Sequence, residues 1–420
     1  MSINFMNGQP SADILPTKLF AQAAQKAFST PNAANDVLQY GDELGHPVFL
    51  KNLADFLSNE YKSPVSNLDY YFKFISHNLC ATPGASLSLQ HLLTLLTRPQ
   101  TVTRHVYFQD PTYFLAFDIF LNVGYTKDQF VGIAEENDSG INVNILEDYL
   151  IKNHHTDDKG SFFPKDKNNH TDNMIFNSVL YCVPTHANPT GSVLSNEKRE
   201  KLVQLGRKYN MLIICDDVYD ILTFEGEIPK RLVAYDLESA GKNANHVVVS
   251  NGSFSKLLAP GSRAGWIEAG ETIIKQVGAC GSFISGGSPS YLSSQIINEM
   301  LIDDSLHHHI EFLKKTHADR LYKGLYEPIQ NELVPLGCSI DIRPKGGYFV
   351  WLRVPITGSK LMDIIRQHNI DVGVGLGTLF TVTKSNEDDY YVRLSFAHYD
   401  TKTLRLGVTR LKQALLIGAT

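Results

Sequence analysis

The sequence lacks paired cysteines, long apolar runs and a strong net charge, and each absence excludes a class of protein. Its five cysteines are odd in number and have no C-x-x-C spacing, so they indicate neither a disulfide framework nor a zinc site. No stretch is apolar for long enough to span a bilayer, and the opening MSINFMNGQPSAD has no basic and apolar regions of a signal peptide. A net charge of -6 gives no basic surface for nucleic acid or an anionic membrane. We therefore expect a cytoplasmic protein with neither of these partners.

The middle of the chain alternates between strand and helix patterns. Residues 179–183 and 212–215 are apolar runs, and a helical pattern over about 196–209 separates them. A strand, a helix and a strand in this order predict a parallel sheet. From about Leu301 a charge-rich helical pattern precedes short strands. We expect a large domain with a mostly parallel sheet flanked by helices and a smaller α+β domain, with the chain divided into an N-terminal arm (1–50), the large domain (51–300) and the small domain (301–420).

Helical spacing also predicts which side chains face inward. The predicted inward residues are Leu19, Ala23, Ala27 and Phe28 in the arm, then Phe49, Leu53, Phe56 and Leu57, then Ala85, Leu89, Leu92, Leu93 and Leu96, and finally Leu202, Leu205 and Tyr209.

The segment 246–266 carries the most informative chemistry. The apolar run Val247, Val248 and Val249 is typical of a buried parallel strand, and open α/β sheets bind ligands at the carboxyl ends of such strands. Lys256 follows this strand, and the hydroxyls of Ser253 and Ser255 with the guanidinium of Arg263 suit a phosphate group. A lysine amine beside a phosphate site suggests pyridoxal phosphate bound as a Schiff base. The alternative is a solvated loop lysine.

The same segment, S-F-S-K-x-x-A-P-G-x-R-x-G-W, closely resembles the lysine segment of class I/II aminotransferases, pyridoxal-phosphate enzymes of fold type I. N-P-T-G, D-x-x-Y and S-x-S-K occur in the order of that family, each after a predicted strand, and the resemblance runs from Gly8 to the last helix. The sequence resembles the branch of this family that contains 2-aminoadipate, kynurenine and aromatic aminotransferases. The resemblance implies the fold, the cofactor and a homodimer whose sites are completed by the partner subunit.

A turn before the predicted helix at 85–96 supplies a second part of the phosphate site. Thr82 is expected to cap this helix, with Pro83 at its first position. The backbone N–H groups of Gly84, Ala85 and Ser86 would then point out of a helix N-terminus, where anions bind. The segment resembles the family's T-x-G-A-Q-x-x-L, with Ser86 in place of the usual glutamine.

Four strand-end residues are expected to contact the cofactor ring. Tyr113, in D-P-T-Y, can stack on the ring, although a core tyrosine is the alternative. Asn188, in N-P-T-G, can donate to the phenolic oxygen and lies near the substrate. Asp216 can keep the ring nitrogen protonated. The alternative is that the adjacent residues Asp216 and Asp217 only terminate a strand. The family spacing D-x-x-Y assigns Asp216 to the nitrogen and Tyr219 to the phenolic oxygen.

Arg393 is the predicted substrate-binding residue. It lies in an apolar strand, Tyr391 to Phe396, where an unpaired charge is costly, and V-R-L-S-F-A matches the carboxylate-binding segment of the family. A structural salt bridge is the alternative. Tyr40 and Gly45 match the family's Y-x-x-x-x-G, which implies that Tyr40 contacts the phosphate of the neighbouring subunit's cofactor and that Gly45 lies near the substrate carboxylate. The loop 373–380 departs from the family's V-x-P-G turn, so donor specificity is not carried over.

Two histidine-containing stretches are not expected to bind metal. The polar run 153–173 has no apolar period and is predicted to be an exposed insertion, and His307, His308 and His309 have no carboxylate at a spacing that makes a believable site.

The predicted reaction is amino transfer. Lys256 holds the cofactor and then moves the α-proton of an L-amino acid, and Arg393 orients this donor, which is aromatic, 2-aminoadipate or another large amino acid. The acceptor is a 2-oxo acid such as 2-oxoglutarate. A carbon–sulfur β-lyase would use the same cofactor residues and remains open. A non-enzymatic regulator on this fold is a further alternative, for which we expect an added DNA-binding domain that the sequence does not show before Met1.

Overall fold

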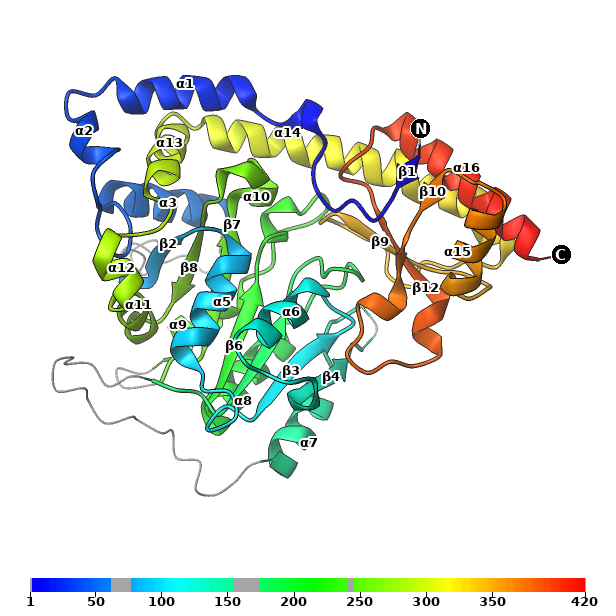
Figure 1. The fold of residues 1–420 in the computed structure, drawn as a ribbon, viewed down its shortest axis with the longest axis horizontal. Coiled ribbons are helices and arrows are strands. Elements are labelled where there is room, and N and C mark those ends of the chain that lie inside the picture. Colours follow the sequence, from blue (N-terminus) through cyan, green and yellow to red (C-terminus); the bar gives the residue numbers. More distant parts are fainter. Residues whose placement is uncertain (1, 62–76, 137, 154–173, 241–244, 420) are drawn as a thin grey trace.

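A seven-stranded sheet forms the centre of the molecule (Figure 1). The computed structural model describes residues 2–61, 77–136, 138–153, 174–240 and 245–419, and within these residues the strand order is β2-β8-β7-β6-β5-β3-β4. β8 runs antiparallel to both its neighbours, and all the other pairs are parallel. The strands are β2 (Leu79–Thr82), β3 (His105–Asp110), β4 (Phe130–Ala134), β5 (Ser178–Cys182), β6 (Met211–Asp216), β7 (Val248–Ser253) and β8 (Gly265–Ala269).

The three central strands are buried along their whole length. Every residue of β5, β6 and β7 is buried, as expected for strands that are covered by helices on both faces. The predicted parallel strand at 247–249 is confirmed on its β6 side, whereas its other neighbour, β8, is antiparallel. Because β5, β6 and β7 are parallel, their carboxyl ends meet at one edge of the sheet.

Helices cover both faces of this sheet (Figure 1). The predicted inward faces at 49–57 and 202–209 are confirmed, since all the named side chains there are buried. Phe28 is wrongly predicted: its side chain is 45% exposed at the last position of its helix. The helices are α1 (Thr17–Phe28), α2 (Ala33–Asp36), α3 (Pro47–Glu60), α5 (Ala85–Leu96), α6 (Leu115–Asn122), α7 (Val143–Asn153), α8 (Asn196–Tyr209), α9 (Leu232–Ser239), α10 (Phe254–Leu257), α11 (Glu271–Gly278), α12 (Gly281–Gly286), α13 (Tyr291–Ile302) and α14 (Ser305–Asp319).

The start of α5 differs from the prediction. Thr82 does not cap the helix, because it is the last residue of β2 and pairs with Gly265 of β8. The chain therefore stays extended through Thr82, and Gly84 is the capping residue, with φ of 95°. This left-handed conformation favours glycine, so the turn into α5 depends on Gly84.

The C-terminal part has a second sheet and its own apolar core. β9 (Phe349–Arg353), β11 (Gly375–Leu376) and β12 (Tyr391–Ser395) form an antiparallel sheet, packed with α15 (Gly358–Gln367) and α16 (Thr401–Gly418). The N-terminal arm joins this part through β1 (Ile3–Asn4), which pairs with β10 (Val372–Gly373). α14 reaches it along the top of Figure 1 and continues in π-helical turns at Arg320–Tyr326 and Ile329–Leu333. The mostly parallel large sheet with helices and the smaller α+β part confirm the predicted fold class, and the domain boundaries stay a prediction.

Among the described helices, none combines the length and the apolar character needed to cross a bilayer.

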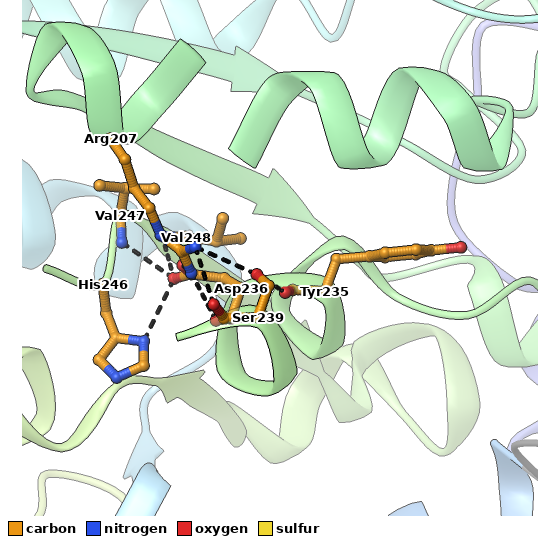
Figure 2. Close-up of polar contacts among 7 residues, drawn as sticks. All are labelled: Arg207, Tyr235, Asp236, Ser239, His246, Val247 and Val248. Carbon is orange, nitrogen blue, oxygen red and sulfur yellow. Dashed lines mark hydrogen bonds and ion pairs between the residues drawn. The ribbon is translucent and has the colours of Figure 1, made fainter. Parts of the chain in front are cut away.

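A buried carboxylate ties α9 to the start of the central strand β7 (Figure 2). Asp236 is fully buried, and its Oδ2 accepts hydrogen bonds from the backbone N–H groups of Val247 (2.9 Å) and Val248 (3.0 Å). Its Oδ1 accepts from Arg207 at 2.5 Å, and His246 Nδ1 lies 3.5 Å from Oδ2. Burial raises the pKa of Asp236, but the interactions with His246 and the two backbone N–H groups outweigh burial and hold this pKa below its ordinary value.

We expect Asp236→Asn to lower the free energy of unfolding by about 2–3 kcal/mol at pH 7.5. The substitution removes the buried negative charge with which Arg207, His246 and the two backbone N–H groups interact. A carboxylate whose folded-state pKa is lowered stabilises the protein above its unfolded pKa, and this stabilisation is lost as the pH falls. The difference between the two proteins, measured by urea denaturation, should therefore persist down to about pH 4 and shrink only as the pH falls further, below the ordinary pKa of 3.8. Glu271→Gln is the matched control, because Glu271 pairs with Lys275 on the surface and should contribute less than about 1 kcal/mol. Equal losses for the two variants would contradict the prediction.

Candidate active site

A cavity of ≈ 460 Å³ lies at the carboxyl ends of the central strands. It brings together predicted residues from seven separate segments, from the start of α5 to β12. The predicted site residues that line it are Ala85, Ser86, Tyr113, Asn188, Asp216, Tyr219, Ser253, Ser255, Lys256, Arg263 and Arg393.

One end of the cavity is built to receive an anion. Ser253 Oγ lies 3.0 Å from Ser255 Oγ and accepts from the backbone N–H of Ser255 at 3.1 Å. A Cβ added to Gly84 would lie 3.4 Å from Arg263 Nη2 and 3.6 Å from Ser253 Oγ, so the glycine turn, the guanidinium and the hydroxyl are immediate neighbours. Arg263 is exposed, and in the described chain its guanidinium donates only to the carbonyl of Pro260. Hydroxyls, a guanidinium without a carboxylate partner and the N-terminus of α5 together form an anion site.

Asp216 lines the cavity, and one of its carboxylate oxygens has no hydrogen-bond partner among the described residues. Its Oδ2 accepts a hydrogen bond from the hydroxyl of Tyr181 at 2.6 Å, while its buried Oδ1 has no partner among the described residues. Burial raises the pKa of Asp216 to about 6, and the charge of Lys256 partly opposes this rise. Asp217 has a different environment: its Oδ2 accepts from Ser250 at 2.6 Å, and it does not line the cavity. The structure therefore separates the two adjacent aspartates.

Lys256, in α10, directs its amine into the cavity. Nζ donates to the carbonyl of Gly8 at 3.0 Å and lies 5.9 Å from the ring centre of Tyr219. Burial lowers the pKa of Lys256 to about 8, Asp216 opposes this change, and the positive charge of Arg393 adds to it. A lysine in this environment is neutral more often than a solvated lysine, so it can act as a nucleophile and a base near neutral pH.

Arg393 is buried in β12 without a carboxylate partner. Its side chain is 3% exposed, and the guanidinium carbon lies 4.1 Å from the ring centre of Phe349 and 4.8 Å from that of Phe380. It donates to Asn188 Oδ1 and to the carbonyl of Met6, both at 2.9 Å. Among the described residues, Arg393 forms no ion pair, and burial lowers its pKa to about 10. A buried cation with only neutral acceptors is available to an incoming carboxylate.

The loop 373–380 is held beside the cavity by Asp110. The carboxylate of Asp110 accepts hydrogen bonds from the backbone N–H groups of Val382 (3.0 Å) and Thr383 (3.2 Å), and the N–H of Thr112 donates to the carbonyl of Phe380 (2.9 Å). The turn that carries Tyr113 and the loop that carries Phe380 are therefore fixed to each other.

Tyr113 is the first of several aromatic and aliphatic residues that line one side of the cavity. It is half-buried, and burial and the nearby charge of Asp216 raise its pKa to about 12, so its hydroxyl is protonated at neutral pH. Phe114, Leu115 and Ile119, from the start of α6, continue the lining of the cavity. This side of the cavity is apolar.

Three predicted site residues do not line this cavity: Gly84, which adjoins the lining residues Arg263 and Ser253, and Tyr40 and Gly45. Tyr40 is 79% exposed, and Gly45 has φ of 111° and packs against Ala81, where an added Cβ would lie 2.8 Å from the Cβ of Ala81. Their predicted roles, which involve a neighbouring subunit for Tyr40, stay predictions.

Several residues that contact the site were not singled out in the sequence, among them Tyr181, Met6 and Gly8. Tyr181 lies inside the predicted strand 179–183, and its only signal was one hydroxyl in an apolar run. Met6 and Gly8 act through their carbonyl oxygens, which carry no side-chain signal, although the G-x-P opening was a resemblance to the family.

The histidine-containing stretches show no metal site where they are described. The part of the polar run at 154–173 lies outside the described residues, and no group of three or more potential metal ligands was found in the described part of the chain. His307 is instead bonded to Glu60, 2.6 Å from its Nδ1.

Comparisons with known proteins agree with this geometry. Residues 2–411 match the family described as Aminotransferase class I and II. The uncharacterized protein YER152C of Saccharomyces cerevisiae is 32% identical over 383 residues, which cover 84% of this chain and 82% of that protein. Aromatic-amino-acid aminotransferase 1 of Thermococcus litoralis is 25% identical over 419 residues, which cover 98% and 88%.

Solved structures of aminotransferases have the same fold. The kynurenine aminotransferase of Pyrococcus horikoshii superposes with a TM-score of 0.78 at 22% identity, covering 100% of this chain and 92% of that one. The sequence match and the fold agree over nearly the whole chain. The chain belongs to the class I and II aminotransferase family and is a pyridoxal-phosphate-dependent aminotransferase of fold type I.

Proposed function

We propose that this aminotransferase moves the amino group of an L-amino acid with a large, uncharged side chain, aromatic donors first, to a 2-oxo acid such as 2-oxoglutarate. One observation carries the proposal: Lys256, the free oxygen of Asp216 and the unpaired guanidinium of Arg393 converge on one cavity with an apolar wall.

Pyridoxal phosphate fits the residues at the two ends of the cavity. Gly84, Ser253 and Arg263 are immediate neighbours, and with Ser255 and the N–H groups of Ala85 and Ser86 these groups would hold the phosphate. The unpartnered Oδ1 of Asp216 is a buried acceptor that suits a protonated ring nitrogen.

The remaining ring contacts would come from Tyr113, Asn188 and Tyr219. Tyr113 would cover the face of the ring, and the Asn188 amide and the Tyr219 hydroxyl would donate to its phenolic oxygen. When bound, the cofactor supplies an electron sink for the pair released at the substrate Cα.

Lys256 would hold the cofactor covalently through its amine and, once released by the incoming donor, take the proton from the donor Cα. The lowered pKa of Lys256, about 8, supports this second role, because a general base works best with a pKa near the operating pH. Gly8 accepts from Nζ and so points the amine into the cavity.

Arg393 would bind the α-carboxylate of the substrate. Its planar guanidinium can make two parallel hydrogen bonds to a carboxylate, and the flanking rings of Phe349 and Phe380 exclude water from this pair. The contact fixes the orientation of the donor, so that its Cα–H bond faces Lys256.

The rest of the cavity favours an uncharged donor side chain. Of the described residues that line it, Lys256, Arg263 and Arg393 carry positive charge, and the roles proposed above occupy all three. No cation among the described lining residues then remains for a distal carboxylate, which argues for aromatic donors over 2-aminoadipate. Gln9 lines the cavity with an exposed side chain, and its amide can bind a polar end, including the second carboxylate of 2-oxoglutarate. The names of the aromatic and kynurenine aminotransferase relatives agree with this donor class.

A donor panel tests the proposed function. With 2-oxoglutarate as the fixed acceptor, we expect kcat/KM for phenylalanine, tyrosine and kynurenine to exceed that for 2-aminoadipate and aspartate by about tenfold or more, because an unpaired carboxylate must be desolvated. Cystathionine is included to measure release of ammonia and pyruvate. If that release is faster than amino transfer from every donor, the protein is instead a β-lyase. No turnover of any donor would contradict both.

The role of Arg393 has its own test. Arg393→Met should lower kcat/KM for phenylalanine by about a hundredfold, since two charge-assisted hydrogen bonds are lost. 2-Phenylethylamine, which has the same side chain without the carboxylate, is the matched substrate and should react equally slowly with both proteins. Arg393→Lys should recover only part of the loss, because an ammonium group cannot form the parallel pair. A similar loss for the amine would show that Arg393 supports the fold of the site and not the carboxylate.

We further propose a homodimer in which Tyr40 reaches the phosphate of the partner's cofactor and Gly45 lies near the substrate carboxylate. The high exposure of Tyr40 in one protomer, 79%, leaves its hydroxyl available to a second copy.

Mixed dimers test this arrangement. Lys256→Ala should abolish amino transfer, and Tyr40→Phe should lower cofactor affinity about tenfold through loss of one hydrogen bond to phosphate. If Tyr40 acts across the dimer, a mixed dimer of these two variants has one site with both intact residues, so the mixture should regain activity at limiting cofactor. The control is a mixture of Lys256→Ala with Lys256→Ala/Tyr40→Phe, which has no intact site. Absence of any recovery in mixed dimers would place Tyr40 outside the partner's site.

A further inference from the structure

Tyr181 has a contact with the site that the proposed roles do not include. It lies in the middle of β5, its side chain is fully buried, and its hydroxyl donates to Asp216 Oδ2 at 2.6 Å. The other oxygen of the same carboxylate, Oδ1, is buried and has no partner among the described residues, and Asp216 lines the cavity. One hydroxyl therefore determines which oxygen of Asp216 is available to a ligand.

The position of this hydroxyl is fixed by packing. β5 and β6 are parallel neighbours, and their register places Tyr181 opposite Ile214, two residues before Asp216. The ring of Tyr181 packs against Phe108 and Phe120, with ring centres 6.0 Å and 6.3 Å away. Both sides of the hydrogen bond thus belong to the rigid core and not to loops.

We propose that Tyr181 is a positioning residue: it holds Asp216 in the ionised form and turns the free oxygen of Asp216 toward the ring nitrogen of the cofactor. This inference rests on the proposed placement of Asp216 at that nitrogen.

The electrostatics of the pair supports the proposal. Burial and the neighbouring charge of Asp217 raise the pKa of Asp216, whereas the hydrogen bond from Tyr181 and the charge of Lys256 lower it. A protonated carboxyl cannot pair with a protonated ring nitrogen, so the balance decides whether the contact forms. The charged or titratable groups that face Asp216 from the surrounding elements are Tyr181, Asp217, Tyr113, Tyr219 and Lys256.

Of these groups, Lys256 is a changing partner. Its charge changes during the reaction, because a free amine is neutral before it takes a proton and positively charged afterwards. Tyr181 donates at every stage, since burial holds its own pKa well above neutral pH. We therefore assign to Tyr181 the constant part of the stabilisation of the Asp216 carboxylate.

The test compares two ligands for the cofactor-free full-length chain: pyridoxal phosphate, and an analogue in which a carbon atom replaces the ring nitrogen. Dissociation constants are measured by absorbance titration between pH 5.5 and pH 8 for wild type, Tyr181→Phe and Asp216→Asn. Tyr107→Phe is the matched control, because Tyr107 is also a buried strand tyrosine but its hydroxyl bonds Asn153 outside the cavity. The analogue carries the same phosphate, so any titration of the phosphate affects both ligands alike.

We expect Tyr181→Phe to weaken binding of pyridoxal phosphate by about tenfold at pH 7 and to leave the affinity for the analogue within about twofold of wild type. In wild type the preference for pyridoxal phosphate should fall as the pH drops through about 6, where Asp216 is protonated. In Tyr181→Phe this fall should occur at higher pH, and Tyr107→Phe should match wild type.

Two outcomes would overturn the inference and can be told apart. If Asp216→Asn discriminates between the ligands but Tyr181→Phe weakens both equally or neither, Tyr181 is only a packing residue. If Asp216→Asn also fails to discriminate, Asp216 does not face the ring nitrogen, and the proposed site falls with the inference.

Discussion

The parallel pairing of β5, β6 and β7 is the constraint on which the site depends. Three buried strands that run in one direction must end at one edge of the sheet, so the residues after them are brought together whatever the intervening helices contain. Asn188, Asp216 and Ser253 come from three strand ends in this way. The small domain and the N-terminal arm then only have to close the open side with Arg393 and a few backbone carbonyls.

Burial is the second organising effect, because it acts on every charge in the cavity. Removing water disfavours the charged forms of Lys256, Asp216 and Arg393, and the pKa values of all three move toward neutrality. Lys256 and Asp216 partly stabilise each other, whereas Arg393 has no anion in the described chain. The cavity therefore carries more positive than negative charge, an imbalance that anionic ligands would correct.

How well a feature could be predicted from the sequence depends on how far apart along the chain the interacting residues lie. The strands, the motif order and the residues at strand ends are local features, and the fold class and the convergence of Asn188, Asp216, Lys256 and Arg393 agree with them. Thr82 was wrongly expected to cap α5. Its pairing with Gly265 of β8 joins residues far apart in the chain, which the sequence around Thr82 does not reveal. The contact of Tyr181 with Asp216 depends on the register of two strands, which hydrophobic periodicity does not give.

Backbone contacts at long range were equally hidden in the sequence. The carbonyl of Gly8 meets Lys256 across 248 positions of the chain, and that of Met6 meets Arg393 across 387 positions. A carbonyl oxygen is present at every residue, so no residue type signals this role. These contacts also determine when the active site can form during synthesis on the ribosome. The first ten residues emerge long before their partners, and the active centre is complete only after β12 has been made and the arm has returned to meet it.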